Sequence, residues 1–204
     1  MSVQPTRANR TQGERSAAMQ RRLLDATVSA LYEKGYGGTT TMEVQQRAGV
    51  SRGALLHHYS SRAELMVAAV EHLTRERITA VLSLVKSQAP KTKRVEWAVQ
   101  VIWGTFEGPL FAASLELWLA ARNDHELLTA LLPQERIVGQ TIRGMAADLF
   151  GPELSASPGF PEALELLFDA MRGAAARSVL RSTDTDDRLV ASWVHMVKEL
   201  TRQD

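Results

Sequence analysis

Cysteine is absent from the 204-residue chain, and aromatic residues make up only 6% of it. Without Cys, a disulfide scaffold, a thiolate zinc site and a Cys nucleophile are excluded. A chain without disulfides fits a reducing compartment, so we expect a cytoplasmic protein. Long apolar runs are also lacking, because charged residues break every apolar stretch before it reaches membrane-spanning length. We therefore expect no membrane partner.

Charges of the two signs nearly balance, with 24 Lys and Arg against 23 Asp and Glu, but they are unevenly distributed. Residues 1–62 hold nine bases and four acids, a net charge of +5, and the remainder holds 15 bases and 19 acids, a net charge of −4. A basic segment of this kind favours contact with a polyanion, although chance clustering on a solvated surface gives the same pattern. The polar residues 1–13 lack the apolar segment of a signal peptide and are predicted to form a disordered, mildly basic arm.

Strand signals are nearly absent, and almost every ordered segment shows helical periodicity. The sequence predicts an all-α fold of about nine helices. Breaks at Gly35, Gly49, Pro90, Gly108, Pro133 and Gly151 separate them, and two long final helices are expected at 161–181 and 185–202.

The strongest motif is a pair of short helices joined by Ala48-Gly49-Val50-Ser51. Thr40 and Glu43 have the spacing of a capping box at the start of the first helix. Gly49 supplies the left-handed conformation that a tight turn needs, and Ser51 caps the second helix. This layout is typical of a helix-turn-helix, whose second helix enters the DNA major groove, and a plain helical hairpin is the alternative.

The run from Thr40 to Leu65 resembles the signature of the tetracycline-repressor (TetR/AcrR) family and covers about the first third of the chain with its flanking helix. The resemblance implies a homodimeric transcriptional regulator, usually a repressor, that is released from a double-stranded DNA operator by a small-molecule effector. It implies a three-helix DNA-binding domain over residues 14–62 and a ligand-binding and dimerisation domain over residues 63–204. An effector-independent DNA-binding or interaction protein with a solid helical core is the alternative.

The resemblance also assigns roles in DNA binding. Thr40 is expected to cap the second helix and touch a phosphate, the residues from Ser51 onward to face the bases, and His58 and Arg62 to contact the backbone. The chain has Gln45 where the family usually has Ala and Leu56 where it usually has Tyr, so one phosphate contact is lost or passes to His57. The predicted DNA-binding residues are Thr40, Thr41, Gln45, Ser51, Arg52, Gly53, Ala54, His57, His58 and Arg62.

Catalytic patterns are missing from the sequence: it shows no Ser/His/Asp arrangement, no paired-carboxylate motif and no phosphate-binding loop. The neighbours His57 and His58 point in different directions on a helix and lack further ligands nearby, so a metal site is not expected. We expect neither an enzyme nor a cofactor.

Aromatic residues gather in the middle of the chain, where they either fill a core or line a small-molecule pocket. We predict an apolar or aromatic effector with at most one charge, bound by Trp103, Phe106, Phe111, Trp118, Arg122, Met171 and Arg172. The last two helices carry broad apolar stripes, with Trp193 central on the final one and the small residues 173–176 on the other. These stripes either close the core of the monomer or, as we expect, form a dimer seam of four helices.

Overall fold

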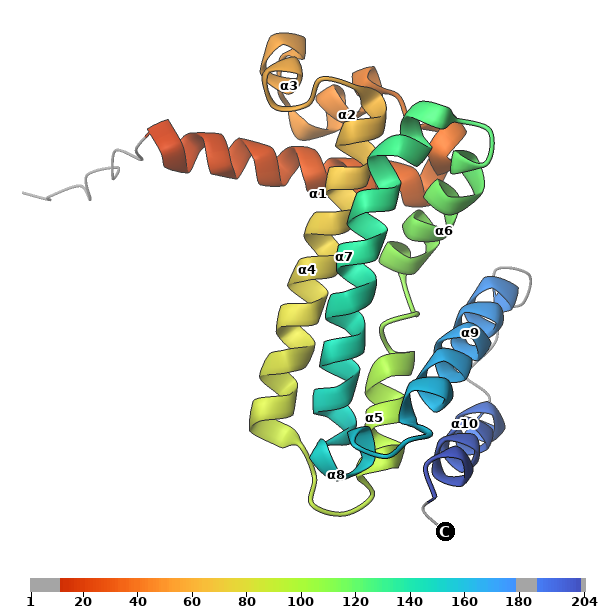
Figure 1. Ribbon diagram of the computed structural model, residues 1–204. Helices are drawn as coiled ribbons and strands as arrows, with labels where there is room; N and C mark the ends of the chain where they lie inside the picture. The colour runs from red at the N-terminus through yellow and green to blue at the C-terminus, as the bar shows by residue number, and fades with distance from the viewer. Residues whose placement is uncertain (1–11, 179–186, 203–204) are drawn as a thin grey trace, which may run out of the picture.

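The computed structural model describes residues 12–178 and 187–202, and these form ten α-helices and no strand (Figure 1). The all-α prediction is confirmed, and a four-residue helix, α8 (Pro152–Ser155), accounts for the tenth. The predicted arm falls mostly outside the described residues, but Gln12 and Gly13 already belong to the first helix. The expected linker at 182–185 also lies outside them.

Three helices form what we call the head: α1 (Gln12–Gly38), α2 (Thr41–Ala48) and α3 (Arg52–His58). Gly35 interrupts α1 with φ 65° and ψ 177°, where the sequence predicted its cap. Thr40 and Ser51 cap α2 and α3 by accepting hydrogen bonds from the amides of Glu43 and Ala54. The reciprocal half of the predicted capping box is wrong, since the Glu43 carboxylate bonds Arg47 at 2.6 Å and Lys34 at 2.9 Å instead.

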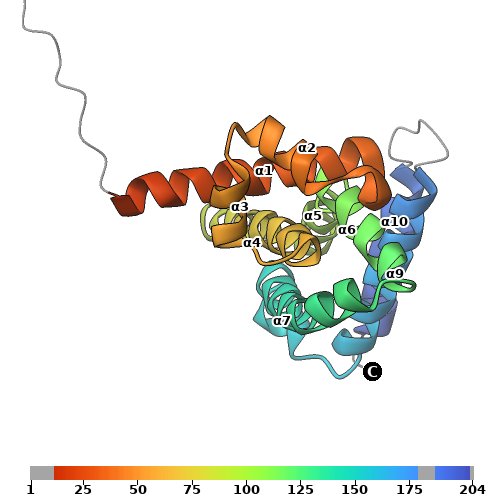
Figure 2. The same cartoon turned by 90° about the horizontal axis from the view of Figure 1, so that it is seen from above.

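The remaining helices form what we call the body. They are α4 (Arg62–Gln88), α5 (Arg94–Trp103), α6 (Pro109–Ala121), α7 (His125–Phe150), α8, α9 (Phe160–Ser178) and α10 (Asp187–Leu200). The long helices α4 and α7 lie side by side and run from the head to the far end of the body (Figure 1). Seen from above, α9 and α10 lie together on the side of the body away from α4 (Figure 2).

The predicted break at Pro133 is wrong, because α7 continues through it. Proline removes one backbone hydrogen bond in the middle of a helix, which leaves the carbonyl of Thr129 without its usual donor. Pro133 is exposed, so water can solvate that carbonyl. The buried stripe on both sides, Leu127 and Leu131 before it and Met145 and Leu149 after it, keeps the helix in place.

Two apolar clusters form the core. The first joins the head to the near ends of α4, α6 and α7 through side chains such as Leu23, Leu55, Met66 and Leu117. The second fills the far end of the body, between α5, α7, α9 and α10. The head therefore shares its core with the body and is not separated from it by a linker. In the part of the chain described here, no helix is long and apolar enough to cross a bilayer.

Candidate DNA-binding surface and ligand cavity

Helix α3 lies on the outside of the head with one face anchored and the other free. Leu55 is 1% exposed and Tyr59 is 4% exposed, and the Tyr59 hydroxyl accepts a hydrogen bond from Gln20 Nε2 at 3.3 Å. Arg52, Gly53 and His57 are exposed on the opposite face. A short helix whose free face begins with a long cationic side chain has the form that reads base edges in a major groove.

The other predicted contacts lie around α3. Ser51 and Thr40 are exposed, and Ala54, Thr41 and Gln45 are half-buried. Because the hydroxyls of Ser51 and Thr40 already accept backbone hydrogen bonds as caps, each retains its own O–H as a donor for a phosphate oxygen.

Arg62 has a different environment from the one that the resemblance implies. Its Nε donates to the carbonyl of Thr39 at 2.7 Å, and its Nη2 donates to the carbonyl of Tyr36. Its guanidinium carbon also lies 3.9 Å from the centre of the Tyr36 ring. Arg62 therefore joins the start of α4 to the end of α1, and its contact with the DNA backbone stays a prediction.

His58 also differs from the expected phosphate contact. Its Nε2 atom is buried and has no hydrogen-bond partner among the described residues. Its neighbour His57 is exposed, with the two rings in an edge-on contact at 5.4 Å. Of the two histidines, His57 is the more exposed, and the contact of His58 with a phosphate stays a prediction.

A network of ion pairs fixes α2 against α1 behind this surface. Arg47 bonds Glu33 at 2.7 Å and Glu43 at 2.6 Å, and Lys34 adds a contact to Glu43. The hydrogen bond from Arg47 lowers the pKa of Glu33, and those from Lys34 and Arg47 lower the pKa of Glu43. Both carboxylates therefore remain ionised and hold α2 in register at neutral pH.

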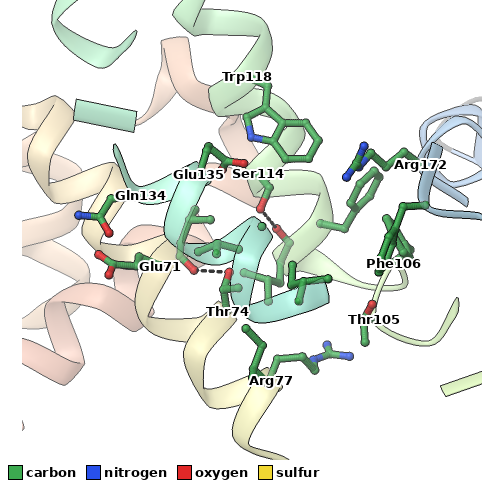
Figure 3. A pocket seen from close by; sticks show the side chains of 18 of the residues that line it. Glu71, Thr74, Arg77, Thr105, Phe106, Ser114, Trp118, Gln134, Glu135 and Arg172 are labelled. Carbon is green, nitrogen blue, oxygen red and sulfur yellow. Dashed lines mark hydrogen bonds between the residues drawn. The ribbon is translucent and has the colours of Figure 1, made fainter. Parts of the chain in front are cut away.

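A cavity of about 150 Å³ lies inside the body, between α4, α6 and α7 (Figure 3). Its wall is mostly apolar, with Trp118 and Glu135 towards one end and Arg77 and Thr105 towards the other. The residues that line it are Val67, Val70, Glu71, Thr74, Arg77, Ile78, Thr105, Phe106, Leu110, Phe111, Ser114, Trp118, Leu131, Gln134, Glu135, Val138, Gly139, Ile142, Met145, Phe168 and Arg172.

Most of the charged groups in this wall have partners. Glu71 pairs with Arg75 at 3.2 Å, Arg77 donates to the carbonyl of Gly104 at 3.0 Å, and Arg172 pairs with Asp169 at 2.8 Å. Within the described ranges, Gln134 and Glu135 have no such partner. These two side chains are the polar groups most available to a guest.

Four of the seven residues predicted to bind a ligand line the cavity, namely Phe106, Phe111, Trp118 and Arg172. The other three lie elsewhere. Trp103 packs against Trp193 with ring centres 5.0 Å apart, Met171 is fully buried in the second core cluster, and Arg122 is exposed just beyond the end of α6. The aromatic residues that cluster in the sequence are thus divided between the wall of the cavity and the apolar core of the body.

The sequence reasoning missed the cavity residues of α4 and α7, because helical periodicity does not distinguish a buried side chain from one that faces a cavity. One signal was present. Thr74 stands four residues after Val70 and four before Ile78, so a polar group interrupts the apolar stripe of α4.

The fold and these two sites define a helix-turn-helix protein with a small cavity between the helices of its body. Comparisons with known proteins agree. The sequence profile of "Bacterial regulatory proteins, tetR family" matches residues 23–69. The HTH-type transcriptional regulator CymR of Pseudomonas putida is 33% identical over 183 residues, which is 83% of this chain and 84% of CymR. The chain belongs to the TetR family of transcriptional regulators, which are DNA-binding proteins and not enzymes.

Solved structures show the same fold. A crystal structure of a transcriptional regulator from Pseudomonas aeruginosa superposes with a TM-score of 0.70 at 21% identity and covers 98% of this chain and 96% of its own. The multidrug binding protein EbrR, solved in complex with imidazole, superposes with a TM-score of 0.65 at 18% identity, over 91% of this chain and 96% of EbrR.

Proposed function

We propose that the protein is a cytoplasmic homodimeric repressor that binds an operator through α2 and α3 and is released when a small ligand enters the cavity. The observation that supports this proposal most directly is the cavity between α4, α6 and α7, because the first turns of α4 share the core of the head and the helix then continues along the cavity wall. The presence of this cavity argues against the solid-core alternative. Residues 14–62 and 63–204 are the corresponding DNA-binding and ligand-binding domains.

For DNA binding, we propose the face of α3 around Arg52 as the base-reading surface, with His57 and the hydroxyls of Thr40 and Ser51 as backbone contacts. A duplex selected from a random pool by the wild-type protein serves as the operator probe. Arg52→Ala is expected to weaken binding to it by about 1–3 kcal/mol and binding to random DNA much less. Arg202→Ala, at the opposite end of the molecule, is the matched control. Equal losses on both duplexes would make Arg52 a backbone contact.

For the effector, the size of the cavity limits the guest. A cavity of about 150 Å³ holds a molecule of about the size of benzene, so we propose a single-ring aromatic compound with at most one charge. EbrR has also been solved with ethidium, and a guest of that size needs an expansion of this cavity.

Thermal unfolding with benzene, benzoate and benzylammonium tests this proposal and shows which charge on the ligand the cavity accepts. A guest that binds only the native state raises the melting temperature by mass action. Trp118→Ala is expected to reduce this rise in melting temperature. Tyr32→Ala, at an exposed position outside the cavity, is expected to leave the rise intact. If none of the three compounds raises the melting temperature of the wild type, the proposed ligand class is wrong.

For the dimer, we propose the exposed face of α9 and α10 as the seam. Leu166 is 45% exposed there, and a Cβ added to Gly173 would meet no atom within 4 Å, so a second helix could approach closely. Trp193 does not lie on this face, since it is 5% exposed and packs on Trp103 within one chain. Leu166→Asp is therefore expected to yield folded monomers in sedimentation. A variant that stays dimeric would place the seam elsewhere.

A further inference from the structure

Tyr36 stands at the point where the head meets the body. It follows the interruption of α1 at Gly35 and is 8% exposed. Each of the three helices around the cavity contributes one charged side chain that contacts it: Arg62 of α4, Glu116 of α6 and Asp124 at the start of α7. We propose that these four residues form a clasp through which an occupied cavity changes the position of the head. The proposal rests on the proposed function, since it concerns how the same cavity acts on DNA binding.

The contacts of the clasp use different atoms of Tyr36. Its amide donates to Glu116 Oε2 at 3.0 Å, and its hydroxyl donates to Asp124 Oδ2 at 2.7 Å. Its carbonyl accepts from Arg62 Nη2, and the same guanidinium covers its ring at 3.9 Å. One residue of the head is thereby held by all three helices at once.

The backbone conformation at Gly35 allows Glu116 to approach the Tyr36 amide. Its φ of 65° lies in the left-handed region, which favours glycine. A Cβ at this position would lie 2.7 Å from Glu116 Oε2, so a side chain would also displace the carboxylate that receives the Tyr36 amide. Gly35 therefore permits both the turn and the close approach of α6.

The protonation states suit a fixed hydrogen bond. Burial, together with the bond to Asp124, raises the pKa of Tyr36 to about 12, so its phenol remains a donor. The amide of Leu127 and the hydroxyl of Tyr36 lower the pKa of Asp124, so its carboxylate remains an acceptor. Asp124 also caps α7 through its other oxygen, which accepts from Leu127 at 2.9 Å.

The cavity and the clasp lie on opposite sides of α6. Ser114 and Trp118 line the cavity, and Glu116 is two residues from each, which is about 200° around an α-helix. On α7, the cap at Asp124 is followed by the cavity residues Leu131, Gln134 and Glu135. A guest that displaces either helix must therefore move Tyr36 or break its hydrogen bonds, because packed helices transmit small shifts instead of absorbing them.

The test replaces the ligand, which is unidentified, by side chains that fill the cavity. Ser114→Phe is the main variant, and Gly139→Leu is a second one on a different wall, used if the first lowers the helix content in circular dichroism. Each is combined with Glu116→Ala, which removes the acceptor of the Tyr36 amide, and with Glu116→Gln, which retains an oxygen there. The readout is the affinity for the selected duplex in a double-mutant cycle.

With the clasp intact, filling the cavity is expected to weaken duplex binding at least about tenfold, and with Glu116→Ala the same filling is expected to weaken it less than about threefold. Glu116→Gln should restore the full effect, which a merely stabilising role of Glu116 would not predict. The same loss in the Glu116→Ala background as in the wild type would overturn the clasp and leave the proposed repressor standing. A filled cavity with no effect on duplex binding would overturn the proposed release as well.

The position of the head relative to the body can also be measured directly, because spin labels attach only to introduced Cys residues in a chain that has none of its own. Spin labels at Gln46→Cys on α2 and Gln140→Cys on α7, both exposed, report the distance between head and body in protein diluted with unlabelled chain. Tyr36→Phe removes only the bond to Asp124, and it is expected to broaden this distance distribution without lowering helix content. An unchanged distribution in Tyr36→Phe and Glu116→Ala would overturn the clasp.

Discussion

The head and the body are held together in different ways. In the head, partners lie close in sequence: Thr40 with Glu43, Ser51 with Ala54, and Arg47 with Glu43, with Glu33 only fourteen residues away. In the body, helices distant in sequence pack through apolar side chains, as α5 does against α10. The head adds an apolar centre at Leu23, Val44 and Leu55 to these local polar contacts, whereas the body is arranged around a cavity.

The difference also separates the two tasks. The centre of the head is fully buried at Leu23, Leu31, Val44 and Leu55, which suits a rigid surface that must match a groove. The cavity wall of the body includes side chains such as Phe106, Phe111 and Trp118 that are only half-buried. The domain that carries the proposed DNA-binding surface thus has a fully buried centre, whereas the proposed ligand site in the body has several half-buried side chains in its wall.

The largest expected effect is on the body. Trp193→Ala removes a buried side chain that packs against Trp103 in the second core cluster, so it should lower the free energy of unfolding by about 3–5 kcal/mol. Chemical denaturation measures the loss. Leu132→Ala, at an exposed position of α7, should cost far less. A small loss for Trp193→Ala would contradict its place in this core.

The next effect distinguishes the two roles of Arg62 in the head. Arg62→Ala leaves the carbonyls of Tyr36 and Thr39 without a charged donor and uncovers the Tyr36 ring, so we expect a loss of about 2–3 kcal/mol in stability. DNA affinity measured at several salt concentrations completes the test. A structural role leaves the salt slope unchanged, whereas a lost phosphate contact lowers it by about one unit.

A smaller effect concerns the free energy of unfolding at acidic pH. The pKa of Asp124 is lowered in the folded protein, so its contribution is present above the unfolded pKa and is lost as the pH falls through the folded pKa. Asp124→Ala should cost about 1 kcal/mol at neutral pH, and the gap from the wild type should close below about pH 4. Denaturation at several pH values measures it. A gap that stays constant down to strong acid would contradict the assignment, and Asp148→Ala, at an exposed position of the same helix, is the control.

The smallest effect is expected at an exposed ion pair of the body. Lys198 bonds Glu96 at 2.7 Å and lowers its pKa, but both side chains are more than one third exposed. Lys198→Met should therefore cost about 0.2–1 kcal/mol, and 1 M salt should remove most of the difference. A larger, salt-independent loss would show that the pair fixes α10 against α5 more firmly than its exposure indicates.

The sequence allowed much of the head to be predicted. Gly49 adopts φ 64° and ψ 41° between two capped helices, as its place in the turn predicted. One prediction failed there because it depended on a competing partner: Glu43 bonds Lys34 and Arg47 instead of its own cap. In the body, Trp103 and Phe106 lie three residues apart, yet only Phe106 lines the cavity.

By itself, the sequence determined the all-α class, the helix-turn-helix and its caps, because these depend on residues within a few positions of one another. Only the tertiary structure decided which apolar side chains face the cavity, that Trp193 packs inside its own chain, and that α4, α6 and α7 meet at Tyr36. The physical reason is that helical periodicity marks the face that leaves water but does not determine what covers that face. That choice is made by side chains far apart in the sequence, such as Trp103 and Trp193, whose ring centres lie 5.0 Å apart.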